Sequence, residues 1–134
     1  MEVNTEEYEV KIKKLDDGTF SDAVVNEYDD GEKLKFTAKI GGKTYVGEDE
    51  DYFTAFKKLR DHLLADGYGM CCAGALVNAL QSGMMAGSDR VYLVRLGEKL
   101  TLKDAVGMFS PAEIEDFPDS KAQEIYAERF FDSI

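Results

Sequence analysis

This 134-residue chain has no tryptophan, only two prolines and no long run of apolar residues. A membrane-spanning helix needs about 20 consecutive apolar residues, so the sequence predicts none. The opening residues, MEVNTEEYEV, lack the basic and apolar regions of a secretion signal, and we therefore expect a cytoplasmic protein. With 44% hydrophobic and 32% charged residues the composition is that of a globular protein, and the length predicts one domain over residues 1–134.

Histidine and cysteine are also scarce. His62 is the only histidine, and the two cysteines, Cys71 and Cys72, are neighbours. A structural zinc site takes four such ligands, and adjacent cysteines do not grip one zinc ion as a C-x-x-C pair does. The acidic residues show no EF-hand spacing. The sequence thus predicts no metal, no cofactor and two free thiols on opposite faces of a strand.

Basic residues are outnumbered, since 16 lysines and arginines face 27 aspartates and glutamates, for a net charge of −11. This balance argues against direct binding to nucleic acid or to an anionic membrane, because both are negatively charged. The acid lies at the ends of the chain, with net charges of −8 over residues 1–51, +2 over 52–109 and −5 over 110–134. A basic protein is the partner that such a charge favours.

Nucleotide-binding loops are missing too, although residues 67–87, GYGMCCAGALVNALQSGMMAG, hold five of the twelve glycines and no charge. The pattern G-x-G-x-x-G would need glycine where Cys72 stands, and the Gly-Lys-Ser or Gly-Lys-Thr of a Walker loop does not occur. The small residues of GMCCAGAL, residues 69–76, instead indicate a short central strand that another element approaches closely. Residues 78–90 are then an exposed loop.

What is present predicts an α+β fold that begins with an antiparallel β meander. Apolar and polar residues alternate in four runs, and Asp-Gly or Gly-Gly turns separate most of them. The runs are EYEVKIKKL, FSDAVVNEY, KLKFTAKI and KTYVG. A long central helix is expected next, because apolar residues recur at helical spacing over residues 53–63 and Gly67 ends the pattern.

The second half predicts a further core strand and a C-terminal helix. RVYLVRL, residues 90–96, has apolar residues on both faces, which is typical of a central strand. SPAE, residues 110–113, has the residue types of a helix start, and Ser120 with Gln123 offers a second start. The last helix is expected to turn five residues toward the core: Ala122, Ile125, Tyr126, Phe130 and Ile134.

Three short motifs follow one another between residues 56 and 109. An amphipathic helix precedes C-x-G-A at residues 72–75, S-G-M at 82–84 and a strand with tyrosine at 91–93. In this order they resemble a family of small uncharacterised bacterial proteins. The resemblance implies a helix–strand–loop–strand unit, and it implies no activity, substrate or catalytic residue.

The function that we favour from the sequence is a protein-binding module. Its acidic surface would meet a basic partner, and an immunity-type protein or an inhibitor of a basic nuclease is one concrete form, because opposite charges speed capture. The loop 78–90 would contribute contacts, since methionine adapts to varied apolar surfaces. The candidate binding residues are Asn78, Gln81, Ser82, Met84 and Met85. Equally, the two methionines could pack beneath the sheet.

The alternative is a small enzyme or ligand-binding protein with a pocket around Cys72 and the same loop. A cysteine nucleophile needs a lowered pKa, usually from a histidine or a helix N-terminus. His62 is the only candidate base, but it lies off the apolar stripe of its helix, which predicts a solvated side chain. The sequence therefore favours a protein without catalytic residues, with Cys72 and His62 as the candidates if catalysis occurs.

Self-association is also open. Edge strands of the meander could pair between two chains, which would give a homo-oligomer. The lysines of KIKK (11–14) and KLKF (33–36) are, however, typical of strands whose edges are guarded against such pairing.

Overall fold

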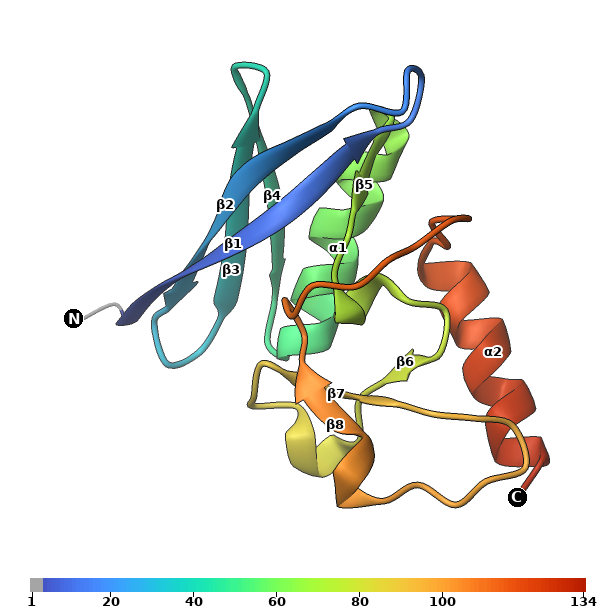
Figure 1. The fold of residues 1–134 in the computed structure, drawn as a ribbon. Coiled ribbons are helices and arrows are strands. Elements are labelled where there is room, and N and C mark those ends of the chain that lie inside the picture. The colour runs from blue at the N-terminus through green and yellow to red at the C-terminus, as the bar shows by residue number, and fades with distance from the viewer. Residues whose placement is uncertain (1–3) are drawn as a thin grey trace.

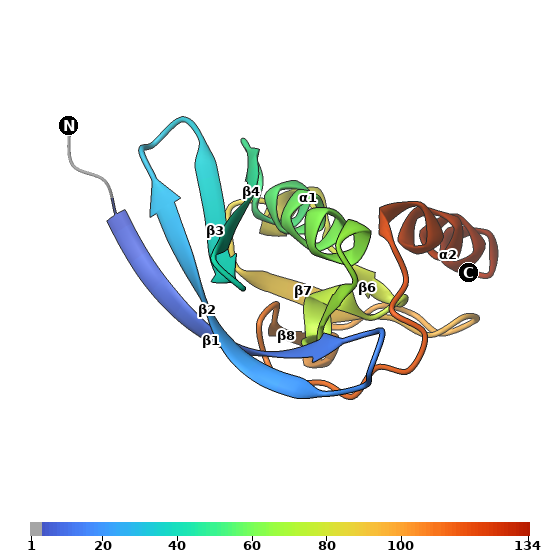
Figure 2. The same cartoon turned by 90° about the horizontal axis from the view of Figure 1, so that it is seen from above.

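The computed structural model describes residues 4–134 and confirms the α+β fold (Figure 1). Its larger sheet has five antiparallel strands in the order β4-β3-β2-β1-β5. They are β1 (Asn4–Lys14), β2 (Phe20–Asp29), β3 (Leu34–Ile40), β4 (Lys43–Asp49) and β5 (Tyr68–Met70). Seen from above, this sheet curls around one side of the molecule (Figure 2).

A smaller sheet and two helices complete the fold. In the smaller sheet β7 (Arg90–Leu93) lies between β6 (Ala79–Leu80) and β8 (Ala105–Gly107). Helix α1 (Tyr52–Ala65) packs on the inner face of the large sheet, and α2 (Ser120–Asp132) lies on the far side of α1 (Figure 2). Among residues 4–134 no helix has the length and apolar character needed to cross a membrane.

The expected meander is confirmed as β1 to β4. The turn between β3 and β4 shows why: Gly41 and Gly42 have φ angles of 60° and 81°, the left-handed pair that a two-residue hairpin requires. The residues of KLKF guard no edge, however, because β3 is paired on both sides. Those of KIKK lie where β5 pairs with β1.

Helix α1 begins and ends where the sequence predicts. The Asp51 carboxylate accepts a hydrogen bond from the backbone N–H of Thr54 at 3.0 Å, and Gly67 follows the helix with a φ of 84°. Its fourteen residues make it a helix of moderate length. It packs directly on β4, because a Cβ atom at Gly47 would overlap the backbone carbonyl oxygen of Ala55.

Residues 69–76 do not form the expected central strand. β5 ends at Met70 and is the outermost strand of its sheet, and Ala73–Ala75 form a single 3-10 turn. Gly74 does allow a close approach, since a Cβ there would lie 3.0 Å from the Met108 side chain. The backbone groups of residues 71–74 form hydrogen bonds with a neighbouring segment, residues 108–112, and therefore do not extend β5.

The expected helix start at SPAE is wrong for the same reason. The Ala73 N–H donates to the Ser110 carbonyl at 2.8 Å, and the Ala112 N–H donates to the Cys71 carbonyl at 3.2 Å. These bonds hold residues 110–112 extended, and a single bridge pairs Cys72 with Pro111. Backbone pairing across the fold thus overrides a favourable local sequence.

The C-terminal helix is confirmed, but its cap and its buried face differ from expectation. Asp119, not Ser120, caps α2, with its carboxylate accepting the Ala122 N–H at 2.9 Å. Phe130 is buried as expected, whereas Ile125 and Ile134 are 51% and 59% exposed. Gln123 is buried instead, although the apolar pattern did not predict it. Its polar side chain is the partner of a charged residue on α1.

That charge is Arg60, whose side chain is 1% exposed. Its guanidinium donates to the Asp61 carboxylate at 2.8 Å, to the Gln123 amide oxygen at 2.6 Å and to the Ser120 hydroxyl at 3.1 Å. The Gln123 amide nitrogen in turn donates to the carbonyls of Gly74 and Leu76, each at 2.8 Å. One network therefore joins α1, α2 and the turn after β5.

We predict that Gly47→Ala destabilises the protein by at least about 2 kcal/mol, because the added methyl group forces α1 away from β4. Gly83→Ala is the matched control, since a Cβ at Gly83 meets nothing within 4 Å, and it should change stability by less than about 0.5 kcal/mol. Urea unfolding at equilibrium measures both. Equal stabilities of the two variants would contradict the close packing of α1 on β4.

Candidate functional site

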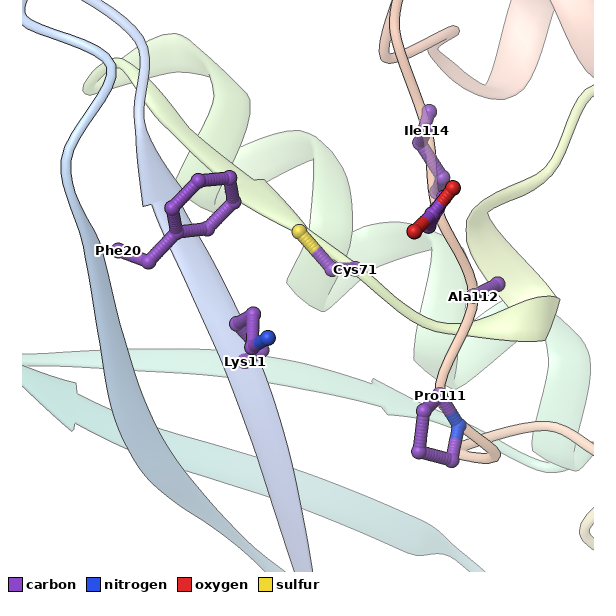
Figure 3. A pocket seen from close by; sticks show the side chains of 7 residues that line it. Lys11, Phe20, Cys71, Pro111, Ala112 and Ile114 are labelled. Carbon is purple, nitrogen blue, oxygen red and sulfur yellow. The ribbon is translucent and has the colours of Figure 1, made fainter.

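The two cysteines face different surroundings. Cys72 is completely buried in the main core. Cys71 lines a groove of about 600 Å³ together with Phe20 and residues 111–114, as Figure 3 shows. The expected pocket around Cys72 is therefore a groove beside Cys71, and among its lining residues none comes from the loop 78–90.

Neither thiol is activated. Burial raises the pKa of Cys72 to about 12, and burial also raises the pKa of Cys71, although Lys11 and Lys13 partly oppose the shift. Since only the thiolate is a strong nucleophile, both cysteines are poor nucleophiles at neutral pH.

His62 does not serve Cys72 as a base. Its Nδ1 lies 2.7 Å from the Val46 carbonyl oxygen, and because a carbonyl only accepts, Nδ1 carries a proton and donates it. The charge of Arg60 partly opposes the raised pKa of Cys72, and Arg60 lies two positions before His62 and therefore about 200° around the helix. The exposed His62 instead forms a hydrogen bond with the Val46 carbonyl of β4.

The amides of the loop 78–90 are used within the fold. The Asn78 amide nitrogen donates to the Val94 carbonyl at 3.0 Å, which fastens β6 to β7. The Gln81 amide nitrogen donates to the carbonyls of Ser88 and Arg90, each at 2.9 Å. Gln81 thereby closes the loop and fixes the residues that follow it.

Three further candidate residues lie in the loop as well. Ser82 is half-buried and directly precedes the turn Gly83–Met85, and the side chain of Met85 packs against the small cluster around Tyr92 and Phe130. The side chain of Met84 lies outside the part of the chain that the structure describes. The loop's contribution to a surface site comes instead from its last residues, 87–89.

Those last residues border a cleft of about 590 Å³ between the meander and the N-terminus of α1. We call it the acidic cleft. Its centre is Glu27, which points inward from β2 and is only 4% exposed. The residues that line it are Thr5, Glu6, Tyr8, Glu27, Asp29, Tyr52, Gly87, Ser88 and Asp89.

Two tyrosines hold the Glu27 carboxylate. The Tyr8 hydroxyl lies 2.8 Å from Oε1 of Glu27 and 3.1 Å from Oδ2 of Asp89, and the Tyr52 hydroxyl donates to Oε2 of Glu27 at 3.1 Å. Tyr8 itself is fixed by stacking on Phe109, with ring centroids 4.3 Å apart. A hydroxyl has one proton, so Tyr8 cannot donate fully to both carboxylates.

The electrostatics of the cleft show an excess of negative charge. Burial raises the pKa of Glu27, and the nearby carboxylates of Asp89 and Glu6 raise it further, although the two tyrosine hydroxyls oppose the shift. Burial, the Glu27 carboxylate and, to a smaller extent, Asp89 raise the pKa values of Tyr8 and Tyr52. Among residues 4–134 no lysine or arginine forms an ion pair with Glu27.

The chemistry of the cleft suits an organic cation. Within the described part of the chain no three histidine, cysteine or acidic residues are placed to hold a metal ion. An ammonium or guanidinium group could instead donate to Glu27 and Asp89 at once and supply the positive charge that the cleft lacks.

One residue in the sequence, Glu27, indicated this cleft, but the search for apolar positions did not consider it. Glu27 stands at an inward position of its strand, since the buried Val25 points the same way two residues earlier. A charged residue at an inward position is expensive unless it has partners or a function. Which residues would join it could not be read from the sequence, because Tyr52 and Asp89 reach it from distant segments.

A scan of the chain against protein-family models gives no match, and a search of curated proteins gives none either.

We predict that an alkylating agent modifies Cys71 of the native protein slowly and Cys72 only after unfolding. The reason is that Cys71 borders a groove, while Cys72 is buried and its pKa is raised to about 12. Mass spectrometry across pH 5 to 9, resolved by residue, measures the two rates. Fast modification of Cys72 at neutral pH would show an activated thiol and restore the enzymatic alternative.

We predict that Glu27→Gln leaves the protein at least as stable as the wild type at pH 7. The raised pKa of Glu27 means that the fold favours its protonated form, so lowering the pH toward its ordinary pKa of 4.5 stabilises the wild type through this group. A neutral glutamine removes that pH dependence. Urea unfolding at pH 7 and pH 5 tests this, and a loss of more than about 2 kcal/mol at pH 7 would make Glu27 a structural residue.

Proposed function

We propose that this protein is a cytoplasmic protein-binding module that takes a lysine or arginine side chain of a basic partner into the acidic cleft. The observation that carries the proposal is the buried Glu27 carboxylate, which has two tyrosine hydroxyls as partners and no cation among the described residues. A buried charge without an opposite charge costs free energy. A partner's cation would remove that cost when it binds.

The surroundings of Glu27 support the same partner. Glu6, Asp29 and Asp89 line the cleft, and residues 1–51, within which the whole meander (residues 4–49) lies, carry a net charge of −8. Such a field attracts basic proteins from a distance and speeds their association. An immunity-type protein or an inhibitor that captures a basic nuclease is the concrete form that we favour.

The tyrosines make the cleft selective. Their hydroxyls hold the Glu27 carboxylate in one orientation, and the Tyr8 ring is itself fixed against Phe109. A cation that enters therefore meets a preorganised acceptor, which lowers the entropy cost of binding. Ions that cannot donate hydrogen bonds in this geometry gain less from the site.

The groove beside Cys71 supports a second candidate, a small-molecule binding protein. Phe20 is 59% exposed at its border, and an exposed aromatic ring over a groove of about 600 Å³ is a common feature of ligand sites. Burial raises the pKa of both thiols, so this candidate concerns binding and not nucleophilic catalysis.

We predict that Glu27→Gln weakens the binding of a basic partner at least about tenfold. Probes are an oligoarginine peptide and a set of small basic proteins that includes nucleases, measured by calorimetry. Affinity for the wild type should fall as salt rises from about 50 to 300 mM. It should also fall as acid protonates Glu27, because a cation binds the carboxylate form.

Glu124→Gln is the matched control, since it removes one carboxylate from an exposed position on α2. It should reduce affinity only slightly, through net charge. Equal effects of the two variants would show that charge alone, without the cleft, governs binding. Absence of binding by the wild type to every basic probe would overturn the proposed function.

A further inference from the structure

The strand β1 has one long open edge. β2 pairs with β1 along Asn4 to Lys13, but on the other side β5 pairs only with residues 12–14. Within residues 4–134 no other segment pairs with residues 4–10 on that side. The N-terminal half of β1 thus borders the molecule (Figures 1 and 2).

The register shows which backbone groups are free. The carbonyl of Lys11 accepts from Cys71 at 2.9 Å, and the N–H of Leu15 donates to Gly67 at 2.8 Å, so odd-numbered residues of β1 face the β5 side. Backbone direction alternates along a strand. The N–H and C=O groups of Thr5, Glu7 and Glu9 therefore point to the open edge.

The opposite border of the sheet is covered. At β4 the Lys58 ammonium donates to the Glu48 carbonyl at 3.1 Å, and His62 donates to the Val46 carbonyl at 2.7 Å. Helix α1 thus supplies side chains to the outward carbonyls of β4. Proteins usually protect strand edges in such ways, because an open edge invites another strand. Within the described residues, an unpaired edge remains along residues 4–10 of β1 and along residues 20–24 of β2, which β3 does not pair. Of these two stretches, the β1 stretch is the one that borders the acidic cleft.

We propose that the open edge of β1 receives an extended segment of the basic partner, which pairs as an added strand in line with β5. This inference rests on the proposed function. Strand addition obtains affinity from backbone hydrogen bonds and specificity from alternate side chains. Thr5, Glu6 and Tyr8 belong both to this part of β1 and to the acidic cleft, so a segment on the edge borders the cleft, with β1 between its backbone and Glu27.

Charge selects a basic segment and disfavours a second copy of this chain. Glu7 and Glu9 are exposed, and Glu6 lines the adjacent cleft. Two β1 edges that paired antiparallel around Glu7 would set that residue against its own copy, and like charges directly opposite destabilise a strand pair. A lysine-rich strand would place opposite charges at the same positions.

The test uses a synthetic nine-residue peptide of alternating lysine and valine, and the same peptide with its central backbone nitrogens methylated. Methylation keeps the charge and removes the N–H donors that pairing requires. We expect methylation to weaken binding at least about tenfold. Amide hydrogen exchange at Thr5, Glu7 and Glu9 should slow when the unmethylated peptide is present.

Variants of Glu7 separate charge from backbone pairing. Glu7→Gln removes the charge, and Glu7→Pro removes the charge together with the outward N–H, which β2 does not use. We expect the proline variant to bind the unmethylated peptide at least about fivefold more weakly than the glutamine variant. Urea unfolding checks that both variants remain folded.

The outcomes distinguish the two proposals. If both peptides bind equally to wild type and to both Glu7 variants, strand addition is wrong, while charge-driven capture of a basic partner stands. If neither peptide binds but basic proteins do, strand addition is likewise wrong. If edge exchange slows with rising protein concentration in the absence of peptide, a second copy occupies the edge, which also overturns the inference.

Discussion

The buried guanidinium of Arg60 is the constraint on which the second half of the structure depends. A charge that is 1% exposed needs partners, and two nitrogens of Arg60, Nε and Nη2, have them on α1 itself and on α2, whereas Nη1 has none among the described residues. Gln123 extends the network by donating to the carbonyls of Gly74 and Leu76. These carbonyls lie in and just after a three-residue 3-10 turn, which is too short to supply their hydrogen bonds from its own backbone. The docking of α2 and the path of the chain after β5 are thus parts of one hydrogen-bonded arrangement.

Arg60 and Glu27 form an instructive contrast. Both are charged residues removed from water, but the charge of Arg60 is met by the neighbouring Asp61 carboxylate, whereas the hydroxyl partners of Glu27 leave its charge uncompensated. A compensated buried charge specifies how elements dock. A buried charge without an opposite charge, such as the Glu27 carboxylate in the acidic cleft, lowers the stability of the free protein, and a bound cation would remove that cost. This difference separates a structural role from a binding role.

Local signals predicted the meander and α1, because alternation, Asp-Gly and Gly-Gly turns and a helical apolar stripe all agree over residues 4–67. They failed where long-range pairing decides the structure. SPAE has the residue types of a helix start, yet the backbone of residues 71–73 holds it extended. The acidic cleft could not be read from the sequence because Glu27, Tyr52 and Asp89 meet only after folding. The predicted contact residues Asn78 and Gln81 donate hydrogen bonds to backbone carbonyls within the fold.

The hydrogen bond of His62 has a consequence for the residues that this position accepts. A backbone carbonyl only accepts, so any side chain that replaces His62 must bring a donor to the Val46 carbonyl. A side chain without a donor would leave that carbonyl of β4 to water or to a strand of another molecule.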